Sequence, residues 1–233
     1  SFRRYEKALE TEMIYPDDYI NKVLHGDCLE LMKQIPDRSI DLILTDPPYG
    51  HGKQVISNNK SRGKLAIAKD YGNGEWNCKT PTFQHFKEMR RISKNQIIFG
   101  GNYFIEHLHN SSCWLVWDKN NGNNDFADCE LAWTSFNSAV RKIKYTWNGM
   151  LQGNMKEKEQ RVHPTQKPVP LIAWILRNYI EQNQIILDPF MGSGTTCVAA
   201  KALDRRFIGI EKEQKYVDIA NRRLHNTVTE MFC

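Results

Sequence analysis

Hydrophobic and polar positions alternate between two periods along the chain, which predicts strands interleaved with helices. Short apolar or alternating runs predict strands within 20–27, 40–46, 95–101, 113–119, 129–136, 139–147, 184–188 and 205–211. Apolar residues spaced three or four apart predict helices within 28–35, 81–92, 102–108, 168–180, 195–203 and 216–224. Such alternation builds a mostly parallel sheet with helices on both faces. We therefore expect one α/β domain over residues 1–233.

Two stretches interrupt this alternation. Residues 51–79 are rich in Gly, Asn and Lys, and residues 137–162 show no apolar period after one short strand. Segments of this length without regular structure are usually functional or disordered. We interpret both stretches as insertions or long loops, and 51–79 as a basic loop.

Positive charge is concentrated in these two stretches. The 233 residues carry a net charge of +5, while each stretch holds six basic against two acidic residues, so the remainder is slightly acidic. This distribution fits contacts with the phosphates of a nucleic acid, although solvated surface loops are the simpler alternative. The candidate DNA-binding residues are Lys53, Lys60, Arg62, Lys64, Arg141, Lys142 and Lys144.

Composition excludes several classes of protein. A hydrophobic fraction of 40% argues against a disordered chain, and no run approaches the roughly 18 apolar residues of a membrane span. The opening residues are charged where a signal peptide is apolar, and the six cysteines include no CxxC pair. We expect a cytoplasmic protein with reduced thiols and no metal site.

The run ILDPFMGSGTT predicts a ligand site. Asp188 ends an apolar strand, and a turn containing Gly192 and Gly194 precedes a helix, an arrangement that cradles ligands at the carboxyl edge of a parallel sheet. Glu211 ends the next strand, where an acid can accept hydrogen bonds from ribose hydroxyls. The pattern favours a cofactor that contains a nucleoside. A turn kept for geometry and a surface acid are the alternatives.

A second motif, TDPPYG, follows the strand at 40–46. Its prolines fix the backbone and leave the Asp46 carboxylate and the Pro47 carbonyl as acceptors beside the ring of Tyr49. Acceptors next to an aromatic face suit an amino group on a planar base. The alternative is a turn whose prolines serve only the backbone.

Together the two motifs resemble the S-adenosylmethionine-dependent amino-methyltransferases of DNA. DPPY precedes the glycine motif here, which resembles the circularly permuted β group found in bacteria, phages and restriction-modification systems. Four further segments match motifs of that group and begin at Gly26, Phe99, Trp114 and His163. The resemblance implies a Rossmann-like methyltransferase fold with a permuted order of motifs.

The resemblance also implies a site for S-adenosyl-L-methionine. Asp27 would accept from the adenine amine, Glu211 from the ribose and Asp188 from the methionine ammonium, while the HPTQKP segment would fasten the carboxylate. The implied cofactor-binding residues are Asp27, Cys28, His163, Thr165, Lys167, Asp188, Phe190, Gly192, Ser193, Gly194, Thr195, Thr196 and Glu211. As an alternative, HPTQKP caps the helix that follows it, through Thr165.

The catalytic residues implied by the resemblance are Asp46, Pro47, Pro48 and Tyr49. Asp46 and the Pro47 carbonyl would orient the exocyclic amine, and Tyr49 would stack on a base flipped out of a DNA duplex. Neither a metal nor a covalent intermediate is required. An acid at position 46 favours adenine N6 over cytosine N4, where a serine is more common.

Several alternatives stay open from the sequence. They are a cytosine-N4 enzyme, an RNA methyltransferase acting on guanine N2, and a catalytically inactive DNA-binding subunit on the same fold. We expect a bacterial, archaeal or phage-encoded monomer or homodimer that acts on double-stranded DNA, with a cognate restriction endonuclease as a functional partner. The resemblance makes 137–162 a short target-recognition insertion. Its residues Asn148, Gln152 and Asn154 can contact base edges or phosphates, or serve solvation only, so the target sequence cannot be read.

Overall fold

The computed structural model describes residues 13–50, 80–122, 127–148, 151–156, 158–162 and 165–229. The strands are β1 (Lys22–His25), β2 (Ile40–Thr45), β3 (Ser93–Phe99), β4 (Trp114–Asp118), β5 (Cys129–Thr134), β6 (Arg141–Lys144), β7 (Trp147–Asn148), β8 (Leu151–Gln152), β9 (Ile185–Asp188) and β10 (Arg206–Glu211). The helices are α1 (Cys28–Lys33), α3 (Phe83–Ile92), α4 (Val169–Tyr179), α5 (Thr195–Ala202) and α6 (Gln214–His225), with short 3-10 turns η3 (Gly101–Tyr103) and η4 (Ile105–His107). Predictions for Lys53, Lys60, Arg62, Lys64 and His163 lie outside the described residues.

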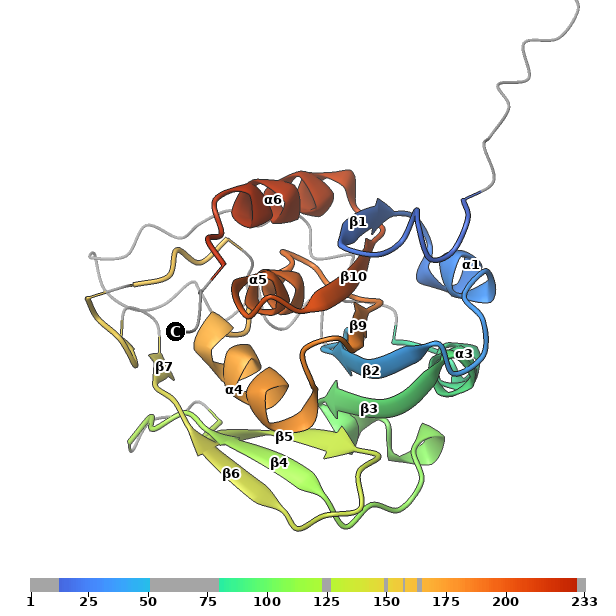
Figure 1. Cartoon of the computed structure of the whole chain (residues 1–233). Coiled ribbons are helices and arrows are strands. Elements are labelled where there is room, and N and C mark those ends of the chain that lie inside the picture. The colour runs from blue at the N-terminus through green and yellow to red at the C-terminus, as the bar shows by residue number, and fades with distance from the viewer. Residues whose placement is uncertain are drawn as a thin grey trace, which may run out of the picture.

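Eight strands form one sheet in the order β1, β10, β9, β2, β3, β5, β4, β6 (Figure 1). Neighbours from β1 to β3 pair in parallel, β5 is antiparallel to both β3 and β4, and β4 is parallel to β6. Within this sheet β5 is therefore the strand that runs opposite to the others. The predicted mostly parallel sheet is confirmed.

Helices cover both faces of the sheet, as predicted. Helices α4, α5 and α6 pack on one face, where they meet Leu42 and Leu44, and α1 and α3 pack on the other, where they meet Ile43 (Figure 1). Successive side chains of a strand point to opposite faces, so an unbroken apolar run such as LIL at 42–44 is what a strand buried on both sides needs.

One prediction about local structure needs correction. Residues 102–108 form no α-helix; the turns η3 and η4 occupy this segment after Gly100, which has a φ of 65°. Gly100 in the left-handed conformation starts the first turn, and Phe104, with a φ of −126°, separates it from the second. Within 137–162 the predicted strand is present as β6, which extends the main sheet, and β7 and β8 add a short antiparallel pair that the sequence pattern did not predict.

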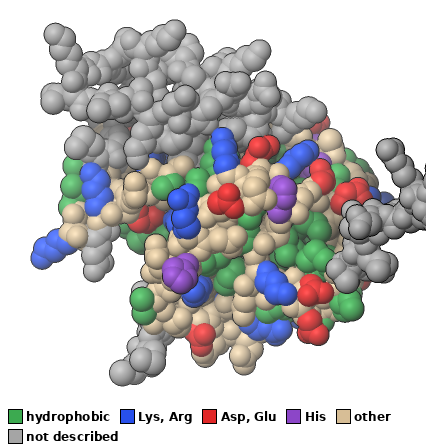
Figure 2. Space-filling view, turned by 90° about the horizontal axis from the view of Figure 1, so that it is seen from above, with side chains coloured by type: hydrophobic (Ala, Val, Ile, Leu, Met, Phe, Trp, Pro, Cys, Tyr) green, Lys and Arg blue, Asp and Glu red, His purple; other side chains and the backbone are tan. Residues whose placement is uncertain are grey.

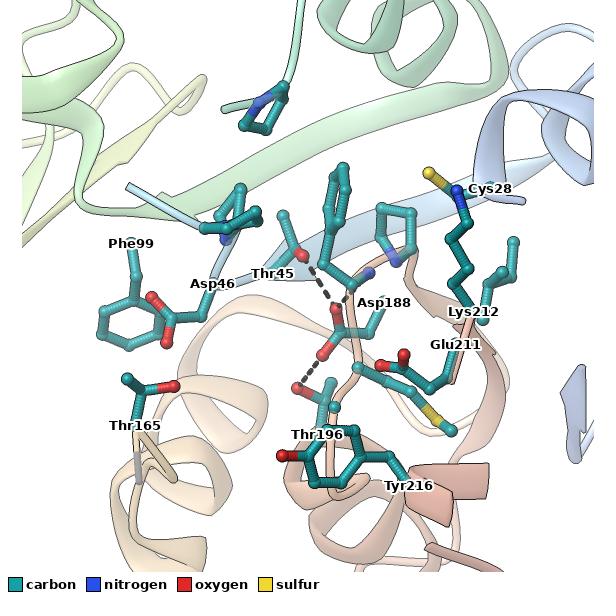
Figure 3. A pocket seen from close by; sticks show the side chains of 18 of the residues that line it. Cys28, Thr45, Asp46, Phe99, Thr165, Asp188, Thr196, Glu211, Lys212 and Tyr216 are labelled. Carbon is teal, nitrogen blue, oxygen red and sulfur yellow. Dashed lines mark hydrogen bonds between the residues drawn. The ribbon is translucent and has the colours of Figure 1, made fainter. Parts of the chain in front are cut away.

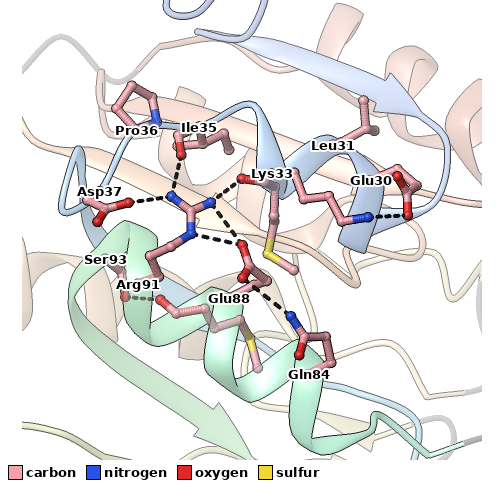
Figure 4. Close-up of polar contacts among 12 residues, drawn as sticks. Glu30, Leu31, Lys33, Ile35, Pro36, Asp37, Gln84, Glu88, Arg91 and Ser93 are labelled. Atoms are coloured by element: carbon pink, nitrogen blue, oxygen red, sulfur yellow. Dashed lines mark hydrogen bonds and ion pairs between the residues drawn. The ribbon is translucent and has the colours of Figure 1, made fainter.

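Helix α1 is anchored to α3 by one arginine (Figure 4). The guanidinium of Arg91 donates to the carbonyls of Met32 and Ile35, each at 2.9 Å, and pairs with Glu88 and Asp37. The last carbonyls of a helix have no partner within the helix, so this arginine satisfies the end of α1. The opposite end of α1 faces the functional site and is fixed by the same contact.

Candidate functional site

A cavity of about 710 Å³ lies at the carboxyl edge of the parallel strands (Figure 3). Residues at or just beyond the ends of β1, β10, β9, β2 and β3 line it: Asp27, Glu211, Asp188, Asp46 and Phe99. The carboxyl ends of parallel strands meet at one edge of a sheet, and ligands bind there in open α/β sheets. The structure thus brings together the two motifs that the sequence analysis singled out.

The glycine turn before α5 forms one wall of this cavity. Gly194 has a φ of 78°, and a Cβ there would lie 2.7 Å from the Cβ of Ala220, so only glycine fits. From α6, Arg223 donates to the carbonyl of Ser193 at 2.7 Å and to the hydroxyls of Ser193 and Thr195 at 3.1 Å. The C-terminal helix therefore holds the turn in place.

Asp188 lies at the centre of the cavity, between two threonines (Figure 3). The hydroxyls of Thr45 and Thr196 each donate to one of its carboxylate oxygens at 2.7 Å, and the amide of Phe190 donates at 3.2 Å. Burial raises the pKa of Asp188 to about 6, although these hydrogen bonds oppose the rise. Oδ1 accepts from Thr45 and Phe190 and Oδ2 accepts from Thr196 alone, so Oδ2 keeps a lone pair for a hydrogen bond from a cationic ligand.

Two further acids lie at the far end of the cavity. Glu211 accepts from the amide of Glu213 at 2.8 Å, and burial raises its pKa. Asp27 caps α1 by accepting from the amide of Leu29 at 2.9 Å, and its other oxygen lies 3.7 Å from Nζ of Lys212. In each case a fixed backbone donor orients the carboxylate toward the cavity wall.

Cys28 follows Asp27 and lines the cavity, but its thiol is not activated. Burial, and then the charge of Asp27, raise the pKa of this thiol to about 12. A thiol of this kind stays protonated near neutral pH, and it is the thiolate that acts as a nucleophile. Cys28 therefore serves as a wall of the site.

Sequence reasoning missed His85 as a residue of this wall. The amide of Thr82 donates to Nδ1 of His85 at 3.1 Å as part of a capping box, and the ring lies 5.7 Å from that of Phe190. Burial lowers the pKa of His85, so the ring is neutral near pH 7. The start of α3 was visible in the sequence, but not that it reaches the cavity.

At the other end of the cavity, Asp46 has partners on both carboxylate oxygens. The hydroxyl of Tyr49 donates to Oδ1, and the ammonium of Lys167 donates to Oδ2. The ring of Tyr49 stacks on Tyr103 with centroids 4.8 Å apart and 23° between the planes. A Cβ at Gly100 would lie 2.2 Å from the Tyr49 ring, so glycine is required for this packing.

Lys167 lies with two acids and a second lysine. Its ammonium is 3.1 Å from Oε2 of Glu130, and Glu130 also pairs with Lys119 at 2.6 Å. The sequence analysis assigned Lys167 to the carboxylate of a cofactor, and the structure instead places its ammonium against Asp46. The sequence contains no local signal for Glu130, because that residue reaches the site through the pairing of β5 with β4.

The segment before α4 is held by Glu159. Its carboxylate accepts from the amide of Val169 at 2.7 Å, so Glu159 caps α4, the role considered for Thr165. Thr165 itself lines the cavity. The amide of Gln152 donates to the Glu159 carbonyl and its oxygen accepts from the Glu159 amide, both at 2.8 Å. Gln152 is 7% exposed and its side chain is bound to Glu159, so of the roles left open for Gln152 the structure favours one within the protein over contact with DNA.

Three of the predicted DNA-binding residues are exposed on the edge strand β6, but they do not share one face. Ile143 points into the core beneath α4, so Arg141 lies on that side while Lys142 and Lys144 lie on the other. Lys142 is 3.4 Å from a carboxylate oxygen of Asp118. On the described part of the face in Figure 2, basic and acidic side chains are intermixed.

Among the described residues, none of the helices has the length and hydropathy to cross a membrane. The chain resembles known proteins over most of its length. Residues 87–222 match the model of a family described as DNA methylase. The type II methyltransferase M.HinfI of Haemophilus influenzae is 31% identical over 254 residues, which cover 89% of this chain and 69% of that protein.

The chain also resembles solved structures of DNA methyltransferases. The crystal structure of an M1.HpyAVI–SAM complex is 26% identical, with a TM-score of 0.51, and the match covers 87% of this chain and 98% of that one. PvuII DNA methyltransferase, described as cytosine-N4-specific, is 20% identical with a TM-score of 0.54, covering 89% of this chain and 88% of that one. At 20% identity the second likeness is one of fold.

Proposed function

We propose a reaction for this chain on the premise that it belongs to the DNA methylase family. The family makes it an S-adenosylmethionine-dependent DNA methyltransferase that acts on an exocyclic amine. We propose further that the amine is N6 of adenine, within a specific sequence of double-stranded DNA. The observation that carries the proposal is the position of Asp46 at one end of a cavity whose centre is lined by Asp188 and whose other end is lined by Glu211.

The cavity fits the cofactor in size and charge. Its volume of about 710 Å³ lies within the range of small-molecule sites, roughly 300–1,000 Å³. Among the described residues, Asp188 and Glu211 form no ion pair, and both are held by neutral donors. Their charge is therefore available to a cationic ligand. When bound, S-adenosylmethionine supplies a methyl group on a positively charged sulfur, which becomes a neutral thioether after transfer.

The residues of the chain have to make a poor nucleophile reactive. The lone pair of an exocyclic amine is delocalised into the base, and hydrogen bonds to Asp46 and the Pro47 carbonyl would orient that nitrogen toward the methyl carbon. The amine nitrogen forms the new N–C bond, the C–S bond breaks with its electron pair on sulfur, and one amine proton leaves to Asp46. A carboxylate suffices as acceptor, because the proton becomes acidic as the N–C bond forms.

Base flipping follows from access to the amine. Within a duplex the amine is stacked and paired, so the target base has to leave the helix to reach Asp46. Tyr49 offers an aromatic ring next to Asp46, but Tyr103 covers one face of that ring. Stacking of the base on Tyr49 therefore requires its other face or displacement of Tyr103, which is 51% exposed.

The test is transfer of labelled methyl from S-adenosylmethionine to duplex DNA, followed by nucleoside analysis of the product. We expect label in N6-methyladenine. Label in N4-methylcytosine would leave the proposed mechanism intact but make cytosine the target base. The fold shared with the cytosine-N4-specific enzyme supports this second candidate. Label in RNA, or binding to DNA without transfer, would refute the proposed function.

A further inference from the structure

Four charged side chains of alternating sign form a row that ends at the wall of the cavity. In order they are Lys119, Glu130, Lys167 and Asp46, and the last two line the cavity. They come from four segments: Lys119 follows β4, Glu130 belongs to β5, Lys167 precedes α4 and Asp46 follows β2. The last contact joins residues 121 positions apart, so it depends on the complete fold.

Burial makes this row unusual. The side chain of Lys167 is 8% exposed, and buried lysines are rare unless they are paired. Burial alone would lower the pKa of Lys167, but Asp46 and Glu130 outweigh it and hold the pKa above the ordinary value. Burial likewise acts to raise the pKa of Glu130, and Lys167 and Lys119 keep it below the ordinary value. Glu130 and Lys167 therefore support each other's charge, whereas burial holds the pKa of Asp46 above its ordinary value even with Lys167 beside it.

Lys167 contacts one oxygen of Asp46 and leaves the carboxylate further lone pairs. We propose, on the basis of the function inferred above, that Lys167 is a positioning residue for methyl transfer, whose ammonium orients the Asp46 carboxylate and keeps it charged. Glu130, anchored by Lys119, holds the ammonium in place. Lys167 thereby acts on the target amine through Asp46, and other residues bind the carboxylate of the cofactor.

The proposal concerns the ionisation of Asp46, so every charged neighbour matters. Burial raises the pKa of Asp46 and Lys167 lowers it, while Glu130 raises it and the hydroxyl of Tyr49 lowers it. Asp188 is coupled to Asp46 from the neighbouring strand β9. The titratable or charged groups around Asp46 come from every neighbouring element. They are Tyr49 after β2, Tyr103 in η3, Asp188 in β9, Glu130 in β5, Lys119 after β4 and Lys167 before α4.

The test compares opposite changes to this row. Lys167→Met removes the cation, so the acid limb of the pH profile of kcat should move up by about one to three pH units. Glu130→Gln removes a neighbouring negative charge, so the limb should move to lower pH. Lys167→Arg should restore a limb near that of the wild type. The affinity for S-adenosylmethionine, measured by calorimetry, should stay within about threefold in all three variants.

A matched control lies at the opposite end of β2. Lys94 pairs with Asp41 at 2.6 Å, and Lys94→Met removes a lysine from a carboxylate outside the cavity. That variant should leave the pH profile in place. Its melting temperature also measures how much stability the protein loses when a Lys–Asp pair outside the cavity is removed.

Two results would overturn the inference. In the first, Lys167→Met keeps the wild-type acid limb and binds S-adenosylmethionine at least tenfold more weakly, which would show that Lys167 binds the carboxylate of the cofactor. In the second, Glu130→Gln leaves the limb in place or moves it upward, a result that counts even if Lys167→Met fails to fold. An absence of methyl transfer by the wild type would instead refute the proposed function.

Discussion

The two ends of the cavity hold their carboxylates in different ways (Figure 3). At the cofactor end, Asp188 and Glu211 are held by threonine hydroxyls and backbone amides. At the target end, Asp46 is held by the ammonium of Lys167, which in turn faces Glu130. Neutral donors leave the negative charge of an acid in place, whereas a lysine cancels it.

This difference matches the charges of the two ligands. A sulfonium cofactor with an ammonium group gains from uncompensated acids in a buried site, because Coulomb attraction is strong where water is excluded. An exocyclic amine is neutral and needs an oriented acceptor rather than net charge. The same residue type, aspartate, can thus serve attraction at one end and geometry at the other, depending on its partners.

The largest effect should come from Asp46. Asp46→Ala removes the acceptor of the amine, so methyl transfer should fall by about 10² to 10³, as expected for a lost transition-state hydrogen bond. The affinity for S-adenosylmethionine should stay within about twofold, since Asp46 belongs to the target end. Single-turnover transfer of labelled methyl and calorimetry measure the two quantities. Equal losses in both would remove the distinction between the two ends.

Asp188 should show opposite effects on stability and on binding. Its folded pKa of about 6 lies above the ordinary 3.8, so the free protein binds this proton more tightly than the unfolded chain does. The contribution of Asp188 to stability is therefore lost as pH rises from about 4 to 6. At pH 8, Asp188→Asn should raise the free energy of unfolding by up to about 3 kcal/mol, and at pH 3 the gain should vanish.

The same variant should bind the cofactor poorly. In the wild type, protonation of Asp188 should weaken the affinity for S-adenosylmethionine below pH 6, and this dependence should be absent in Asp188→Asn. Chemical denaturation and calorimetry across pH 4–8 measure both. A variant that is less stable at pH 8 would show that the carboxylate is not penalised by burial.

Glu211 sharpens the comparison further. Glu211→Ala should weaken binding of S-adenosylmethionine by roughly 1.5 to 3 kcal/mol, the worth of a hydrogen bond to a charged group. The value of kcat at saturating cofactor should change little. The exposed Glu181, which follows α4 outside the cavity, gives the control variant Glu181→Ala. Unchanged affinity of the Glu211 variant would remove this residue from the site.

The smallest effect concerns the edge strand β6, far from both ends. If Lys142 and Lys144 contact phosphates through their shared face, Lys142→Gln with Lys144→Gln should lower the log–log salt slope of DNA binding by about 1.8. Arg141→Gln, on the opposite face, should leave the slope unchanged. Fluorescence titrations at several salt concentrations measure the slopes. Equal slopes for all variants would exclude β6 from the DNA-binding surface.

Much of the fold was predictable because local periodicity is decisive where strands are buried on both sides. The runs that became β2, β3, β9 and β10 are apolar. Asp46 and Gly100 follow the first two and Asp188 and Glu211 end the others, so the edge where these positions meet followed from parallel pairing alone. The segment at 102–108 shows the limit. Its apolar spacing is helical, but the backbone angles at Gly100 and Phe104 are not, and apolar spacing carries no information on them.

The partners of the site residues were not predictable. The contact of Lys167 with Asp46 and that of Glu130 with Lys119 depend on the order of strands in the sheet, which periodicity does not specify. For Gln152 the sequence left contact with DNA open, because a glutamine side chain can contact bases or phosphates. Its side chain instead forms two hydrogen bonds with the backbone of Glu159. A polar side chain is buried readily when a backbone segment satisfies both of its groups.

The position of β1 has a consequence for synthesis of the protein. In the sheet β1 pairs with β10, and Arg223 of α6 donates a hydrogen bond to the glycine turn before α5. β1 is synthesised before β10 and α6, so β1 lacks its partner strand until β10 has left the ribosome. The cofactor pocket is thus completed only after α6 has been made. A chain stalled before β10 would expose the edges of β1 and β9, which invites aggregation.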